Sequence, residues 1–174
     1  VLDADGPTTV GGGEAALLRT SFGLAALGHE VVAFVPLAGG KTTHKGVLFR
    51  PLEEATVAVL AEPFDTVCSW SDVKALVLTP PTARRVYVQQ LNDMPAASSF
   101  WRAVDVVVPA SATHGRFLAQ AMPPGASVVW QPLYGGVLPE LWANALAWPL
   151  REPVVSWWSS PDRGLHHLLA IWPR

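Results

Sequence analysis

The sequence has few of the features that mark several large classes of protein. It contains one cysteine, Cys68, which excludes an internal disulfide and favours a reducing compartment. No apolar run reaches the roughly 18 to 20 residues that a membrane span needs. The first residues lack the basic and apolar regions of a secretory signal peptide. We therefore expect a cytoplasmic protein without a membrane span.

Charge is also scarce. Only 15% of the residues are charged, and the formal net charge is −2. Nucleic-acid binding relies on basic surfaces, so no nucleic-acid partner is expected. Half of the residues are hydrophobic, and 174 residues are enough to bury a sizeable core.

Metal ligands and nucleophiles are sparse as well. Asp3 and Asp5 form an Asp-x-Asp pair, but it opens the chain and is interpreted as a polar loop after a strand end. His166 and His167 are adjacent on a predicted helix, where neighbours point about 100° apart, so they cannot share a metal. Three isolated histidines are expected to pack or to lie on the surface: His29, His44 and His114. No metal site is predicted.

Strand and helix patterns alternate along the chain. The predicted strands are 29–34, 46–51, 64–69, 84–89, 104–108, 127–129 and 154–156. The predicted helices are 15–27, 52–61, 72–77, 100–103, 112–122, 139–148 and 165–172. Gly28 is expected to end the first helix, and Ser111 to cap the fifth. This pattern predicts an α/β fold, a Rossmann-like parallel sheet with helices on both faces.

A glycine run precedes the first helix. Gly11-Gly12-Gly13-Glu14-Ala15-Ala16 satisfies the spacing G-x-G-x-x-A of a dinucleotide-binding turn, and a helix N-terminus there suits an anion. The acidic residue that should follow the second strand is missing, because that strand ends in Phe34-Val35-Pro36-Leu37. No Gly-Lys-Ser/Thr follows either. A nicotinamide or flavin site and a P-loop are therefore disfavoured.

A second candidate phosphate site lies near the end of the chain. In the segment Ser159-Ser160-Pro161-Asp162-Arg163-Gly164-Leu165, Ser160 suits an N-cap and Pro161 the first helical position. Arg163 adds a forked cation at a helix N-terminus, an arrangement that suits a diphosphate. A well-capped helix without a ligand is the alternative interpretation.

Several segments together resemble GT-B fold glycosyltransferases of the family 4 type. Gly12-Gly13-Glu14, with a helix that ends Leu27-Gly28-His29-Glu30-Val31, is similar to the opening of their first domain. Phe64-Asp65-Thr66-Val67 resembles their next buried strand, and Val104-Asp105-Val106-Val107-Val108-Pro109-Ala110-Ser111 the segment that lines their cleft. The segment 130–142 is similar to their Asn-Gly-Val-Asp-x-x-x-Phe segment, and 159–165 to the start of their second domain.

The resemblance implies two Rossmann-like domains that face a cleft. Residues 1–150 would form the acceptor-side domain, and residues 151–174 the first strand and helix of an incomplete donor-binding domain. The implied enzyme is a hexosyltransferase, which moves a sugar from a nucleotide-diphosphate sugar to an acceptor hydroxyl. The nucleotide sugar is a co-substrate, and no metal or other cofactor is expected. The 174 residues by themselves are expected to be an inactive fragment.

The resemblance also implies roles for individual residues. The donor phosphates would be bound by Gly12, Gly13, Ser159, Ser160, Arg163 and Gly164. The catalytic positions would be Asn92 and Asp93. The acceptor side of the cleft would be lined by Glu14, Ser111, Gly135 and Gly136.

The chain departs from the family pattern in three places. Asn92-Asp93 stands where many members have His-Asp, the Asn and Asp after Trp130 are replaced, and the chain stops at Arg174, before the acidic donor-binding motif. An alternative function is therefore a non-catalytic Rossmann-like binding or scaffold domain. A nucleotide-dependent oxidoreductase is a weaker alternative, because Leu37 stands where an acid is needed.

Overall fold

The computed structural model describes residues 12–37, 39–70, 72–91, 93–95, 97–134 and 165–171. The chain separates into two compact units, Val1–Gly135 and Gly136–Arg174. In the second unit the described element is helix α7 (Leu165–Ile171), which confirms the helix predicted there. The strand at 154–156, the helix at 139–148 and the domain boundary after residue 150 lie outside the described residues and stay predictions.

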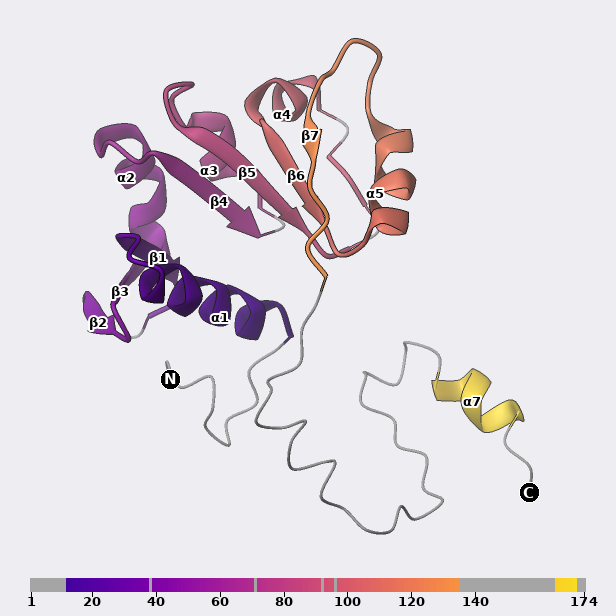
Figure 1. The fold of residues 1–174 in the computed structure, drawn as a ribbon, viewed down its shortest axis with the longest axis horizontal. Coiled ribbons are helices and arrows are strands. Elements are labelled where there is room, and N and C mark those ends of the chain that lie inside the picture. The colour runs from indigo at the N-terminus through magenta and orange to yellow at the C-terminus, as the bar shows by residue number, and fades with distance from the viewer. Residues whose placement is uncertain are drawn as a thin grey trace. The chain divides into compact units, whose positions relative to one another are not determined.

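The first unit alternates strands and helices along the chain (Figure 1). Its helices are α1 (Gly12–Ala26), η1 (Leu52–Glu54), α2 (Ala55–Ala61), α3 (Lys74–Leu78), α4 (Ser98–Ala103), α5 (Ala112–Leu118) and η2 (Ala119–Ala121). Its strands are β1 (Val31–Val35), β2 (Thr42–His44), β3 (Val47–Pro51), β4 (Thr66–Trp70), β5 (Arg84–Gln89), β6 (Val106–Pro109) and β7 (Val129–Trp130). The predicted alternation is confirmed, and β5 has the bounds predicted for it.

The described strands form two sheets. The smaller has the order β1-β3-β2, with β1 parallel and β2 antiparallel to β3. The larger has the order β4-β5-β6-β7 and is parallel throughout. Parallel neighbours need a crossover after each strand, and the helices α3, α4 and α5 provide these crossovers. The α/β class with a parallel sheet is confirmed, whereas helices on both faces of one Rossmann-like sheet stay a prediction.

Helix α1 packs on the smaller sheet through a cluster of Leu18, Ala33, Val47 and Phe49. Leu18 and Ser21, three residues apart in α1, are buried. Gly28 follows the helix with φ 91°, a left-handed conformation that favours glycine, which confirms its predicted role at the end of α1.

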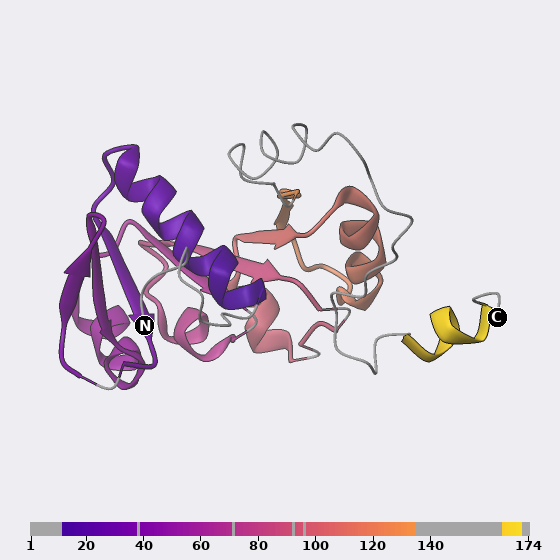
Figure 2. The ribbon, with the colours of Figure 1, turned by 90° about the horizontal axis from the view of Figure 1, so that it is seen from below.

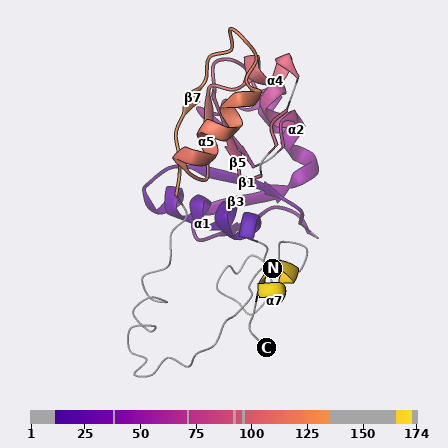
Figure 3. The same ribbon diagram turned by 90° about the vertical axis from the view of Figure 1, so that its right-hand side faces the viewer.

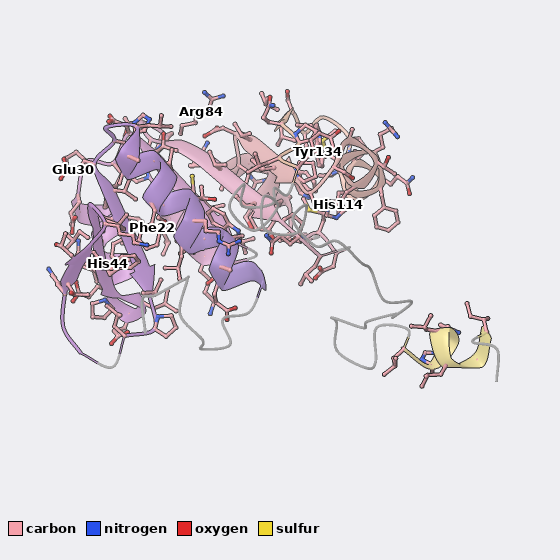
Figure 4. All side chains as sticks on the ribbon, turned by 60° about the horizontal axis from the view of Figure 1, so that its bottom comes forward. Phe22, Glu30, His44, Arg84, His114 and Tyr134 are labelled. Carbon is pink, nitrogen blue, oxygen red and sulfur yellow. The ribbon has the colours of Figure 1, made fainter. Side chains whose placement is uncertain are left out.

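Strand β2 is the part of this unit that the sequence analysis took as a loop. It pairs with β3 through a two-residue turn in which Lys45 and Gly46 have φ 47° and 78°. Two positive φ angles give a turn whose twist matches paired strands, but lysine is an uncommon residue there. The turn therefore has no clear sequence signal. The hairpin also places the His44 ring 5.6 Å from the Phe22 ring of α1 (Figure 4).

The larger sheet buries one face against α3 and α4. Tyr87 of β5 and Val107 of β6 are opposite each other in the ladder, and both join Leu76 of α3 and Phe100 of α4 in one hydrophobic cluster. The Tyr87 and Phe100 rings lie 4.9 Å apart with edge-to-face geometry. Trp101 of α4 belongs to the same cluster and is 4% exposed.

Two arginines form ion pairs that sequence periodicity does not predict. Arg50 of β3 is buried and donates to Glu62 at 2.6 Å and to Glu54 at 2.9 Å, and it lies over the Phe34 ring. These pairs tie β3 to both ends of the segment that contains α2.

Arg85 joins the amino ends of β5 and β6. Its Nε and Nη2 donate to the two carboxylate oxygens of Asp105, at 3.1 and 3.0 Å, and its backbone N–H donates to Asp105 at 2.7 Å. The Arg85 hydrogen bonds hold the pKa of Asp105 below its ordinary value. The pair fixes the register of these two strands at the edge opposite to their carboxyl ends.

Asp105→Asn tests this pair. An aspartate whose pKa is lowered on folding stabilises the protein above about pH 4, the ordinary value in an unfolded chain, and loses that contribution as the pH falls through the lowered value. We expect the variant to lose about 1 kcal/mol of unfolding free energy at pH 7. The difference from wild type should vanish in acid, where Asp105 is protonated.

Urea unfolding of wild type and variant at pH 7, and again in acid where Asp105 is protonated, measures this effect. Asp65→Asn is the matched control, because the exposed Asp65 precedes the neighbouring strand β4. A loss for Asp105→Asn that is equally large at neutral and acidic pH would contradict the role of the charged pair.

Candidate functional site

The candidate site lies where the parallel strands end. Helix α1 begins at Gly12, so Gly12 and Gly13 belong to its first turn and not to a loop before it, which corrects the predicted glycine turn. A Cβ on Gly13 would lie 3.4 Å from Oε1 of Gln90, the residue that follows β5. Figures 1 and 2 show the N-terminal end of α1 on the side where β4, β5 and β6 end. The first backbone N–H groups of α1 are therefore presented at the carboxyl edge of the larger sheet.

The segment after β5 is shaped by Gln89. This side chain is 2% exposed, and its Oε1 accepts the backbone N–H groups of Gln90 and Leu91 at 3.0 and 3.2 Å. Its Nε2 donates to the backbone carbonyl of Asp93. One buried amide thus satisfies three backbone groups, those of Gln90, Leu91 and Asp93, and we call these three residues the β5 loop.

His114 joins the β5 loop to helix α5. The backbone N–H of Ala110 donates to its Nδ1 at 3.2 Å, and Nε2 lies 3.0 Å from the carbonyl oxygen of Leu91. With Nδ1 as the acceptor from Ala110, the tautomer that fits both contacts donates from Nε2 to the Leu91 carbonyl. Figure 4 shows His114 near the start of α5.

Ser111 completes the turn between β6 and α5. Its Oγ accepts the backbone N–H of His114 at 3.0 Å, which confirms the predicted N-cap. His114 is three residues after this cap, at the position from which a capping-box side chain reaches back to the preceding backbone. The sequence analysis assigned His114 to packing or the surface, and its place after Ser111 was the signal that could have indicated more.

Asp93 supplies a carboxylate at the same edge. The Asp93 side chain is exposed. Burial of Tyr87 is the main cause that raises the pKa of its phenol to about 12, and the negative charge of Asp93 adds to this effect. The Tyr87 phenol is therefore neutral, and the Asp93 carboxylate lies within electrostatic reach of it. Asp93 thus supplies an exposed carboxylate within the β5 loop.

Trp70 adds a donor that the sequence analysis did not consider. It ends β4 and is the register partner of Val88 in β5, so the Trp70 and Val88 side chains lie on the same face of the sheet. Its Nε1 is buried and has no hydrogen-bond partner in the part of the chain that the structure describes. A buried N–H without an acceptor is costly, so Trp70 is a polar group at this edge that a ligand or water would stabilise.

The structure brings together some of the predicted site residues. Gly12, Gly13 and Glu14 lie in the first turn of α1, where the exposed Glu14 carboxylate complements the helix dipole. Gly13 lies beside the β5 loop that carries Asp93, and Ser111 lies in the turn joined to this loop through His114. The remaining predicted site residues lie outside the described residues: Asn92, Gly135, Gly136, Ser159, Ser160, Arg163 and Gly164.

The chemistry available at this edge is that of hydrogen-bond donors and two carboxylates, those of Glu14 and Asp93. The first turn of α1 offers N–H groups to an anion, and Gln90 offers a side-chain amide. Among the described residues there is no group of three His, Cys, Asp or Glu side chains that would hold a metal ion.

No helix of the described residues is long and apolar enough to cross a membrane. Comparison of the chain with protein-family models, with curated proteins and with solved structures found no match.

Gln89→Leu tests the organisation of the β5 loop. The variant keeps the size of the side chain but leaves two backbone N–H groups and one carbonyl without their partners. We expect a loss of about 1–3 kcal/mol in unfolding free energy, and faster amide hydrogen exchange at Leu91.

The exposed Gln120 of η2 gives the matched control, Gln120→Leu. If Leu91 exchanged at the same rate in both variants, Gln89 would not be the residue that holds the loop.

Proposed function

We propose that this chain is part of a GT-B glycosyltransferase of the family 4 type, and that its first unit contains the acceptor-side domain. The reaction would move a sugar from a nucleotide-diphosphate sugar to an acceptor hydroxyl. The observation that carries the proposal is the approach of Gly13, in the first turn of α1, to Gln90 at the end of β5.

This observation has functional weight because of where it lies. In open α/β sheets, ligands bind in the crevice outside the carboxyl ends of the strands. A helix that opens with two glycines lets a ligand approach its free N–H groups closely, because no Cβ intervenes. The parallel sheet, the glycine-initiated helix and the polar β5 loop therefore support binding of an anionic ligand at this edge.

Each group has a role in the proposed reaction. The acceptor oxygen attacks the anomeric carbon, the bond from that carbon to the diphosphate oxygen breaks, and the diphosphate leaves with the electron pair. The N–H groups of Gly12 and Gly13 would stabilise the negative charge of the leaving diphosphate. Asn92 and Asp93 would orient the acceptor, and the Asp93 carboxylate would take its proton.

The other assigned residues complete the proposal. By the family resemblance, the donor phosphates would be bound by Ser159, Ser160, Arg163 and Gly164, and the acceptor side of the cleft would be lined by Glu14, Ser111, Gly135 and Gly136. Arg163 and helix N-termini would supply the charge stabilisation that other transferases obtain from a metal.

A non-catalytic Rossmann-like binding or scaffold domain is the second candidate. One observation favours it: Gln89, Ser111 and His114, three polar side chains at the carboxyl edge, all bond to backbone groups of this chain. Side chains used in this way hold the fold and are less available for chemistry.

Gly13→Val tests the proposal. A valine side chain would occupy the space between α1 and Gln90, so we expect the affinity for UDP or GDP to fall by about tenfold or more. Isothermal titration with the two nucleotides and their sugar conjugates measures this change.

Gly23→Val in the same helix is the matched control, because a Cβ there meets no atom within 4 Å. Equal nucleotide affinity in the two variants would show that the first turn of α1 does not contribute to the binding site. Binding of a sugar nucleotide by the enzyme in its full length, with no transfer or release of the diphosphate, would favour the scaffold alternative.

A further inference from the structure

A pocket lies between helix α5 and the end of strand β7. Its volume is about 340 Å³. Its lining comes from Pro109, Ala112, Gly115, Arg116, Ala119, Trp130 and Pro132. All of these residues belong to the first unit, and Figure 3 shows α5 beside β7. Small-molecule sites begin at about 300 Å³, so this pocket has room for a ligand of about two fused rings.

The pocket exists because α5 has small residues on the side that faces β7. Gly115 is buried, and a Cβ there would lie 3.1 Å from Cγ of Pro109 and 3.8 Å from Cε3 of Trp130. Gly115 therefore lets the helix approach the sheet closely at this point. Ala112 lies three residues before Gly115 in α5, and Ala119 lies four residues after it, at the start of η2. Both line the pocket, and their short side chains leave the space open.

The walls of the pocket are apolar except for Arg116. Two proline rings and the half-buried Trp130 indole provide flat carbon surfaces, which suit a planar apolar group. The exposed Arg116 donates from Nη2 to Oγ1 of Thr113 at 3.0 Å. This bond uses one of the five N–H groups of the guanidinium and holds its permanent positive charge at the rim of the pocket.

We propose that this pocket binds an organic anion, a ligand with a planar apolar body and one acidic group. The apolar body would lie against Trp130 and Pro132, and the acidic group would accept hydrogen bonds from Arg116. The proposal does not depend on glycosyl transfer, because it uses neither the first turn of α1 nor the β5 loop.

Two fluorescent probes of the same ring system test the proposal. Anilinonaphthalene sulfonate carries a negative charge, and phenylnaphthylamine is its neutral counterpart. We expect Arg116→Gln to lower the affinity for the sulfonate by about threefold to fivefold, since an exposed charge pair contributes modestly to binding. The affinity for the neutral probe should stay unchanged. Higher salt should reduce the affinity of the sulfonate alone.

Filling the pocket should displace both probes. We expect Ala119→Phe to reduce both affinities by about tenfold or more, because the phenyl ring would occupy the apolar space. Ala121→Phe is the matched control: Ala121 is exposed on the same 3₁₀ turn and does not line the pocket. Urea unfolding of each variant establishes that the fold is kept.

Two results overturn the proposal. If Ala119→Phe and Ala121→Phe bind the probes equally well, the probes bind elsewhere on the surface. If Arg116→Gln changes the affinities for the two probes to the same extent, or changes neither affinity, the pocket does not select an anion.

Discussion

The candidate site depends on the hydrogen bonds that the buried side-chain amide of Gln89 makes to the backbone after β5. Strand β5 has a neighbour on each side in the parallel sheet, so the chain that leaves it must turn at the carboxyl edge. Gln89 provides the partners that the backbone of this turn needs, at Gln90, Leu91 and Asp93. Without a buried acceptor and donor at that point, the β5 loop would have to satisfy these groups with water.

The same strand is fixed at its other end by a different polar pair. Arg85 and Asp105 join β5 to β6 at the amino edge, and His114 joins the β5 loop to α5 at the carboxyl edge. Polar contacts at both ends of a strand that is packed through Tyr87 restrict its sliding against β6. This register gives the β5 loop a constant position, where Gly13 of α1 meets Gln90. A preorganised edge of this kind is what an anion-binding site at a parallel sheet requires.

The sequence predicted those parts of the fold that depend on local pattern. Apolar strands between helical segments gave the alternation, Gly28 the end of α1, and Ser111 the cap of α5. The β2 strand was missed because its turn places Lys45 at a positive φ, which residue preferences do not favour.

The candidate site was predicted only in part, for a physical reason. Gly13 was singled out by the glycine spacing and Asp93 by the family resemblance, and the structure places both at the carboxyl edge. Gln89 and His114 were not, because their partners are backbone groups that only the tertiary structure brings within reach. Trp70 gave no signal either, since a tryptophan that ends an apolar strand has the pattern of a packing residue.

The central claim is that α1, the β5 loop and the start of α5 form one ligand site. The most direct test is a nuclear magnetic resonance titration of the nitrogen-labelled protein with UDP or GDP. The account predicts that the amides of Gly12, Gly13, Leu91, Asp93 and His114 shift together with a single dissociation constant, while Asp65 and Ala83, at the opposite edge of the sheet, stay unchanged. The absence of chemical-shift changes at these five amides, or changes concentrated at the opposite edge of the sheet, would contradict the claim.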